Sequence, residues 1–388
     1  MSYIRTLLIL VVGLPAVQER DPSINRQRRV TFLCAAFVIF VTVLNIAGQD
    51  NAGNLRKEAL AEYRLGHYSQ AELILNRALE AAPQTSNEYE VALVYAALGD
   101  TYQGEMRLQE AEQLYRKSIS ILLRQPERSH ALAIMWRNLA SALTAETDYP
   151  AALAALDRAS KLAETKKLID AQLMAEILNG RGIIYFHQGQ LGKAKTYLAR
   201  AAQIIPAPIE PWELSAEDIL NNLAGVYQNS GESRKAEQTY KRALELTEIR
   251  VGPSHPNVAP TLTNLGALCV ELKRYKEAES YFQRSLQILA QPETGTNEYR
   301  LMEALYGLGK TYMKENDPIR AEPILRRAAD IARRNQNQPF LIPEILHLLD
   351  DYEAVLRNLR NPEDADLLHA EAQRIRAASA FTVRVRSK

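Results

Sequence analysis

One spacing recurs along most of this chain and restricts what the chain can fold into. A small residue, alanine or glycine, is followed twelve positions later by an alanine, and this pair occurs seven times. Successive alanines of the pairs lie 40 to 43 residues apart. Such periodicity predicts an array of structural repeats in which each repeat contacts only its neighbours. The small residues are Ala59, Gly99, Ala140, Gly182, Ala224, Gly266 and Gly309, and the alanines are Ala71, Ala111, Ala152, Ala194, Ala236, Ala278 and Ala321, with an eighth alanine at Ala365.

Each repeat has the residue pattern of two helices. Leu223 and Tyr227 are four positions apart, as are Ala236 and Tyr240, and this is the spacing of apolar residues on one helix face. Prolines and a Gly-Pro pair lie between repeats, where they end the second helix before the next repeat begins. The small residues allow two helices to approach closely, and Tyr115, Tyr240, Phe282 or Leu325 fills the space between them. One helical hairpin cannot bury its own apolar face, so we predict an all-α solenoid of about eight stacked hairpins.

These residues resemble the tetratricopeptide repeat family, whose pattern is Leu-Gly-x-x-Tyr, then Ala, an aromatic residue, Ala and often Pro. The repeat length of about 42 residues, with Ser254–Pro256 ahead of Thr263–Gly266, is similar to the kinesin-light-chain subgroup. The resemblance covers residues 54–378 and implies a right-handed solenoid of helix-turn-helix units. It also implies a role in protein–protein interaction.

The first 49 residues differ from the repeats. Val30–Leu44 carries no charged residue, and Arg26, Arg28 and Arg29 precede it. This pattern fits a cleaved signal peptide, and it equally fits an uncleaved membrane anchor with the arginines on the inside. A buried globular helix is the third alternative. Under the first two alternatives the repeat body is exported or membrane-anchored and lies outside the cytoplasm. At the other end, residues 379–388 form a basic tail.

The composition argues against several functional classes. Lys and Arg number 47 against 46 Asp and Glu, so the chain lacks the basic excess of a nucleic-acid-binding protein. The two cysteines rule out a disulfide framework, and Cys269 occupies a packing position that favours a buried thiol. The six histidines are too far apart for a helical metal pair, and His255 follows a helix breaker, where a helix-start role is favoured. We therefore expect no catalytic site, no metal and no cofactor.

The resemblance implies that the first helix of each hairpin lines a concave groove. Asn138, Asn222 and Asn264 each directly precede the packing leucine of such a helix. An amide can both donate and accept, so this ladder resembles one that binds an extended peptide backbone. The alternative is that each asparagine caps a helix or faces water. The predicted partner-binding residues are Arg137, Asn138, Asn179, Asn221, Asn222, Asn264, Tyr306 and Lys310, with Ser141, Ile183, His187 and Gln228 beside them.

The predicted function is a non-enzymatic scaffold that binds an extended segment of another protein in this groove. Contact with a membrane is expected only through the N-terminal segment, and no nucleic acid is expected as a partner. Two other functions fit the same repeats: a structural component of an envelope complex, and a regulatory module acting on a separate enzyme. A carrier of a small molecule is a weaker alternative, because a packed solenoid offers a groove rather than a closed pocket.

Overall fold

The computed structural model describes residues 52–81, 88–164, 171–205, 216–290, 298–336 and 341–386, and the regular elements in these ranges are helices. The proposed signal or anchor at Val30–Leu44 lies outside the described residues. Within the described ranges, no helix is both long and apolar enough to cross a membrane.

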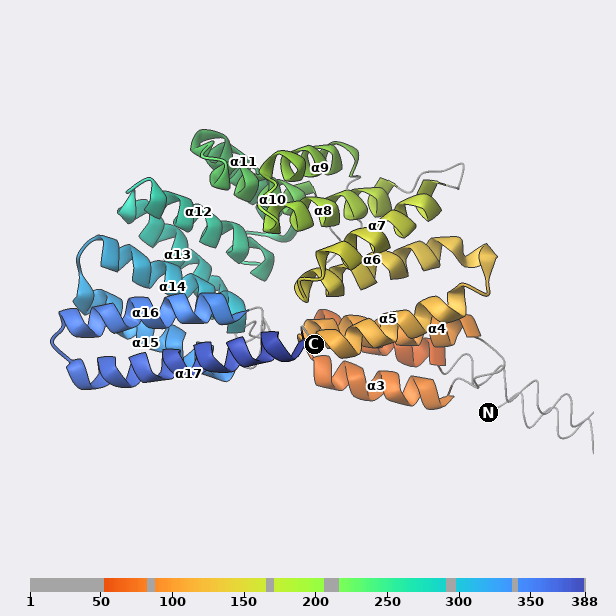
Figure 1. Ribbon diagram of the computed structural model, residues 1–388. Coiled ribbons are helices and arrows are strands. Elements are labelled where there is room, and N and C mark those ends of the chain that lie inside the picture. Colours follow the sequence, from red (N-terminus) through yellow and green to blue (C-terminus); the bar gives the residue numbers. More distant parts are fainter. Residues whose placement is uncertain are drawn as a thin grey trace, which may run out of the picture.

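The helices pair into hairpins that follow one another in a curved array (Figure 1). This confirms the predicted all-α solenoid and gives eight hairpins over the described residues. The pairs are 52–64 with α3 (Tyr68–Ala81), α4 (Glu88–Gly104) with α5 (Leu108–Leu122), α6 (Ser129–Ala145) with α7 (Tyr149–Glu164), α8 (Ala171–His187) with α9 (Leu191–Ile204), α10 (Ala216–Asn229) with α11 (Ser233–Val251), α12 (Ala259–Glu271) with α13 (Tyr275–Leu289), α14 (Glu298–Lys314) with α15 (Pro318–Arg334), and α16 (Ile342–Asn358) with α17 (Pro362–Arg386). Two short 3₁₀ helices, η1 (Pro126–Arg128) and η2 (Pro256–Val258), precede α6 and α12.

The turn inside each hairpin has the same backbone geometry. One residue per turn has a positive φ, and the N–H of the next residue bonds back to a carbonyl five positions earlier, as from Arg274 to Cys269 at 2.8 Å. This is the helix ending that glycine favours, because glycine has no Cβ to clash in the left-handed region. Three of the eight turns have glycine there. The others have Met106, Thr147, Lys273, Asn316 and Arg360.

The small residues of the repeat pack against large side chains, as predicted. A Cβ added to Gly266 would lie 2.8 Å from Cζ of Phe282, and one added to Gly307 would also collide with that ring. Phe282 of α13 therefore lies between glycines of α12 and α14. Gly99 faces Tyr115 and Gly309 faces Leu325 in the same way.

Cys269 and His255 take the roles that their positions in the sequence predict. Cys269 is 1% exposed, as expected for a buried thiol, and His255 is the N-cap of η2, where its Nδ1 accepts from the N–H of Asn257 at 3.2 Å. The predicted solenoid ends at Ala378, and the remainder is predicted to be a tail. The structure differs there, because α17 continues without a break to Arg386.

Candidate functional site

A groove with a volume of about 1680 Å³ runs along the inner side of the array. Most of its wall comes from the first helix of successive hairpins: residues 52–64, α4, α6, α8 and α10. α12, α14 and α16 contribute further residues, so one hollow extends from the first to the last hairpin. The first helices thus take the position that the resemblance implies for them.

The structure places most of the predicted residues in this groove and separates four of them from it. Gln228 is one of the four, and its Nε2 donates to Glu271 on α12 at 2.7 Å. Tyr306 and Lys310 line a smaller hollow of about 690 Å³, which adjoins the groove at Pro343 and Glu344. Asn264 does not line the groove itself but contacts Asn221, which does. The predicted residues that line the groove are Arg137, Asn138, Asn179, Asn221 and Asn222, together with Ser141, Ile183 and His187.

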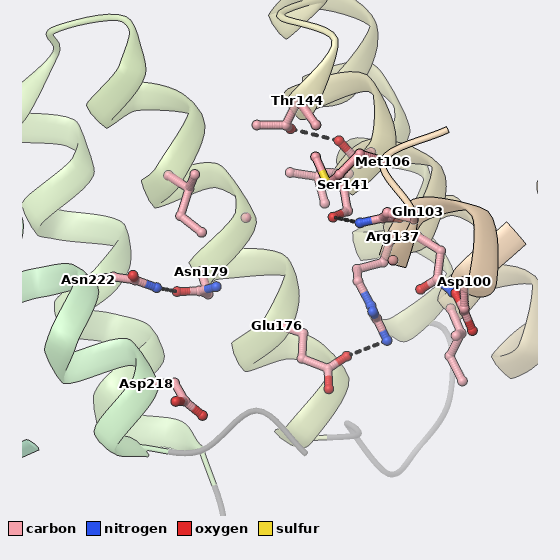
Figure 2. A pocket seen from close by; sticks show the side chains of 18 of the residues that line it. Asp100, Gln103, Met106, Arg137, Ser141, Thr144, Glu176, Asn179, Asp218 and Asn222 are labelled. Atoms are coloured by element: carbon pink, nitrogen blue, oxygen red, sulfur yellow. Dashed lines mark hydrogen bonds and ion pairs between the residues drawn. The ribbon is translucent and has the colours of Figure 1, made fainter. Parts of the chain in front are cut away.

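Asparagine side chains pair across consecutive repeats in the middle of the groove. The Nδ2 of Asn222 on α10 donates to Oδ1 of Asn179 on α8 at 3.0 Å, as Figure 2 shows. Asn264 on α12 donates to Oδ1 of Asn221 on α10 at 3.3 Å. None of these four amides caps its own helix. Each pair uses one donor and one acceptor, which leaves an amide oxygen and further N–H groups for a ligand.

Charged side chains follow one edge of this row of amides. Arg137 on α6 contacts Glu176 on α8 at 2.9 Å (Figure 2), and Asp218 of α10 lines the same groove. Glu176 also accepts from Gln172 at 3.0 Å. The partly buried ion pair joins two repeats, so Arg137 stabilises the groove wall as well as lining it.

The opposite edge of the row is uncharged and partly aromatic. Ile183 and His187 follow Asn179 along α8, and the ring of His187 stacks on Tyr149 with 6.2 Å between centroids. Burial lowers the pKa of His187 and so favours its neutral form. The groove therefore has a charged edge, an amide floor and an aromatic edge.

The residues at one end of the groove form a buried polar cluster. Asp100 Oδ1 on α4 accepts from the hydroxyl of Tyr115 at 2.7 Å and from Nδ2 of Asn138 at 2.9 Å. Burial raises the pKa of Asp100, while these two hydrogen bonds and the charge of Arg137 oppose the rise. Asn138 is only 6% exposed. Asn138 is predicted to belong to a ladder that binds a peptide backbone, but its Nδ2 is already engaged with Asp100.

The smaller hollow is built from tyrosine–carboxylate contacts. Tyr306 donates to Asp351 Oδ2 at 2.8 Å, and Lys310 Nζ lies 5.2 Å from the centre of the Tyr306 ring. Tyr299 donates to Glu344 at 3.3 Å. Both bonds join α14 to α16, so the Tyr306 hydroxyl is already engaged within this chain, and the contact of Lys310 is with the Tyr306 ring of its own helix.

Sequence reasoning missed the acidic residues of the groove. Glu176 and Asp218 each lie six positions before the small residue of their repeat, so a search at that position would have found them. Asp100 directly follows Gly99, as Ser141 follows Ala140. The position directly after the small residue identifies Ser141 in the third repeat. The same position in the second repeat is Asp100.

The described residues contain no group of three or more His, Cys, Asp or Glu side chains arranged to hold a metal ion. Cys269 is the free thiol in these ranges, and burial raises its pKa to about 11. A thiol with that pKa is almost entirely protonated at neutral pH and is a poor nucleophile. Cys269 does not line the groove, whose wall carries hydrogen-bonded amides and an ion pair.

Comparison with known proteins identifies the repeats. A family model described as tetratricopeptide repeat matches residues 90–165, 215–291 and 271–334, and a second model of the same description matches 137–207. Among curated proteins, no sequence matches the chain significantly.

Several solved structures are similar. The apo form of the quorum sensor NprR from B. thuringiensis has a TM-score of 0.63 at 14% identity, covering 91% of this chain and 94% of its own. A Rap protein complexed with competence and sporulation factor has a TM-score of 0.54 at 16% identity, with coverage of 86% and 99%. A putative kinesin light chain from Podosopora anserina, with nearly identical repeats, has a TM-score of 0.42 at 14% identity, with coverage of 55% and 99%.

At these identities the first two likenesses show the fold alone. The first family model matches more than half of the chain, on the residues that form the α4–α7 and α10–α15 hairpins. The chain belongs to the tetratricopeptide repeat family.

Proposed function

We propose that the protein is a non-enzymatic scaffold whose groove binds an extended segment of another protein. The observation that carries this proposal is the row of asparagine pairs, Asn179 with Asn222 and Asn221 with Asn264, on three consecutive first helices. An extended segment has backbone N–H and C=O groups that are not paired within the segment. Each pair of amides has both a free acceptor and free donors, so it complements such a backbone whatever the side chains are.

The arrangement also lowers the entropic cost of binding. The amide pairs are held by bonds between repeats, so their side chains are ordered before a ligand arrives. The Rap protein, which has a similar fold, was solved with competence and sporulation factor, and this supports a solenoid of this kind holding a ligand.

The test is capture of partners by the full chain and by two variants. In Asn222→Ala/Asn264→Ala, both donors of the amide pairs are removed. The matched control is Asn229→Ala, because Asn229 lies on the same helix as Asn222 but is exposed and donates to its own helix at 2.9 Å. An envelope extract is the first source of partners, because the proposed signal or anchor would place the repeats outside the cytoplasm.

The expected result is a set of proteins captured by the native chain and by Asn229→Ala but lost with the double variant. Purified segments of a captured protein should then bind the native chain and Asn229→Ala more tightly than they bind the double variant. Capture that is equal for all three chains would contradict groove binding and would favour a structural assembly through the outer face.

A further inference from the structure

Two oxygen atoms at the α4–α6 end of the groove lack hydrogen-bond donors. Asn138 is only 6% exposed and donates its Nδ2 to Asp100 Oδ1, while its own Oδ1 is buried without a partner. Asp100 Oδ1 accepts both from Asn138 and from Tyr115, whereas Oδ2 accepts from no described residue. Buried polar atoms such as Asn138 Oδ1 are almost always paired in native proteins, whereas Asp100 is only half-buried and its Oδ2 is accessible. Because Asp100 and Asn138 both line the groove, these two acceptors point to a ligand that donates hydrogen bonds.

The charges around the two oxygens are not balanced by this chain. Arg137 is the nearby cation, but its Nη2 is paired with Glu176 at 2.9 Å, and no ion pair joins it to Asp100 among the described residues. Arg56, the other cation on this part of the wall, is paired with Glu90 at 2.7 Å. One guanidinium therefore faces two carboxyl groups, and Asp100 has no counter-charge of its own in this chain. A ligand that donates hydrogen bonds and is positively charged complements it.

We infer that this cluster binds an ammonium group of the segment held in the groove, which donates to Asp100 Oδ2 and Asn138 Oδ1. The inference rests on the proposed function. An ammonium has three N–H donors and one positive charge, so it satisfies both oxygens and balances the carboxylate. The ammonium comes either from the amino terminus of the segment or from a lysine side chain.

Arg137 distinguishes these two sources. Its Nε is buried and has no acceptor in this structure. An amino terminus has the carbonyl of its own residue close to the ammonium, and that carbonyl can accept from Nε. A lysine ammonium is four methylene groups from its backbone and brings no such acceptor. The amino terminus is therefore the source that the cluster satisfies more completely.

The test uses a random-sequence octapeptide library with amidated carboxyl ends, passed over the immobilised full chain. One half of the library has free amino termini and the other half is acetylated, so the halves differ in one charge. Retained peptides are sequenced by mass spectrometry. The variant is Asp100→Asn, which keeps an oxygen for Tyr115 and Asn138 but loses the charge. The matched control is Asp157→Asn, since Asp157 lies on α7 outside the groove and pairs with Arg181.

The native chain and Asp157→Asn should retain free-amine peptides about tenfold more than acetylated ones, the effect of one charge-assisted hydrogen bond. Asp100→Asn should reduce this preference to about twofold or less while still retaining peptides. Lysine enriched at one position of the acetylated half would support the ammonium site and assign the group to a side chain.

Equal retention of the two halves by the native chain, with no enrichment of lysine, would overturn the inference and leave groove binding intact. A preference that persists in Asp100→Asn would overturn it as well. If the native chain retains neither half, the proposed function fails and the ammonium site fails with it. The comparison of halves on the native chain does not depend on how well the variant folds.

Discussion

The side-chain amide of Asn222 on α10 donates to Oδ1 of Asn179 on α8 at 3.0 Å. The two residues belong to consecutive repeats, so the bond fixes how one hairpin is rotated on the next. Asn264 and Asn221 repeat this contact one hairpin further along. Each such bond contributes about 1 kcal/mol to stability. The inner face of the array is therefore held in register by the same side chains that are proposed to bind a partner.

The close packing of small residues predicts opposite effects for two glycine substitutions. In Gly266→Ala, the new methyl group would collide with Phe282, which is 1% exposed and has no room to move. We expect a loss of about 1–3 kcal/mol in the free energy of unfolding. Gly192 of α9 has open space around it, so Gly192→Ala should raise that free energy by about 0.5–1 kcal/mol. Urea unfolding followed by circular dichroism measures both, and shifts of the same sign would contradict the packing described here.

The hairpin turns predict a stabilising substitution at Thr147. This β-branched residue has a φ of 67°, a conformation in which its Cβ is strained. Thr147→Gly should raise the thermal midpoint, because it removes strain of about 1 kcal/mol. Gly231 has a φ of 74° in the equivalent turn, so Gly231→Ala should lower the midpoint. A lower midpoint for Thr147→Gly would show that the threonine side chain contributes more than the strain that it causes.

Burial decides how much an ion pair contributes to stability. Glu217 is 5% exposed and contacts Arg250 within the α10–α11 hairpin. Glu217→Gln should lower the free energy of unfolding by about 2–4 kcal/mol, because the largely buried guanidinium loses this counter-charge. Glu245→Gln breaks an exposed pair with Arg242 and should change the free energy by less than about 0.5 kcal/mol. Urea unfolding measures both free energies. Similar losses of stability in the two variants would show that burial does not decide the contribution of these ion pairs.

Glu303 predicts a particular dependence of stability on pH. Burial raises the pKa of Glu303 from 4.5 to about 7, and the nearby carboxylate of Glu344 contributes to this rise. Between these two pH values the folded state holds a proton that the unfolded state releases, so stability falls as the pH rises from 4.5 to 7. Glu303→Gln should remove this decline, which is on the order of 1–3 kcal/mol.

The matched control is Glu58→Gln, since Glu58 is exposed on the first described helix. Unfolding midpoints measured from pH 4.5 to 8 should follow the native profile in this control and become flatter in Glu303→Gln. Identical profiles for the two variants would show that Glu303 ionises normally in the folded protein.

The sequence predicts the hairpins better than it predicts the groove. The spacing from Gly266 to Ala278 is local, and it determines which residues of α12 and α13 meet, so the fold follows from the pattern. The contact of Asn138 with Asp100 joins residues 38 positions apart. Whether they meet depends on how one hairpin rotates against the next, and no local spacing encodes that rotation. The repeat spacing could have placed Glu176 on the groove wall beside Arg137's helix, but it could not have predicted that the two side chains pair.

Groove binding is tested most directly by hydrogen–deuterium exchange of the full chain, alone and with a captured partner segment. Protection is expected in the helices that line the groove, above all α6, α8, α10 and α12. It should be strongest around the pairs Asn179–Asn222 and Asn221–Asn264. The outward helices α7, α9, α11 and α13 should exchange at unchanged rates. Protection confined to those outward helices, with no change around Asn179 and Asn221, would contradict binding in the groove.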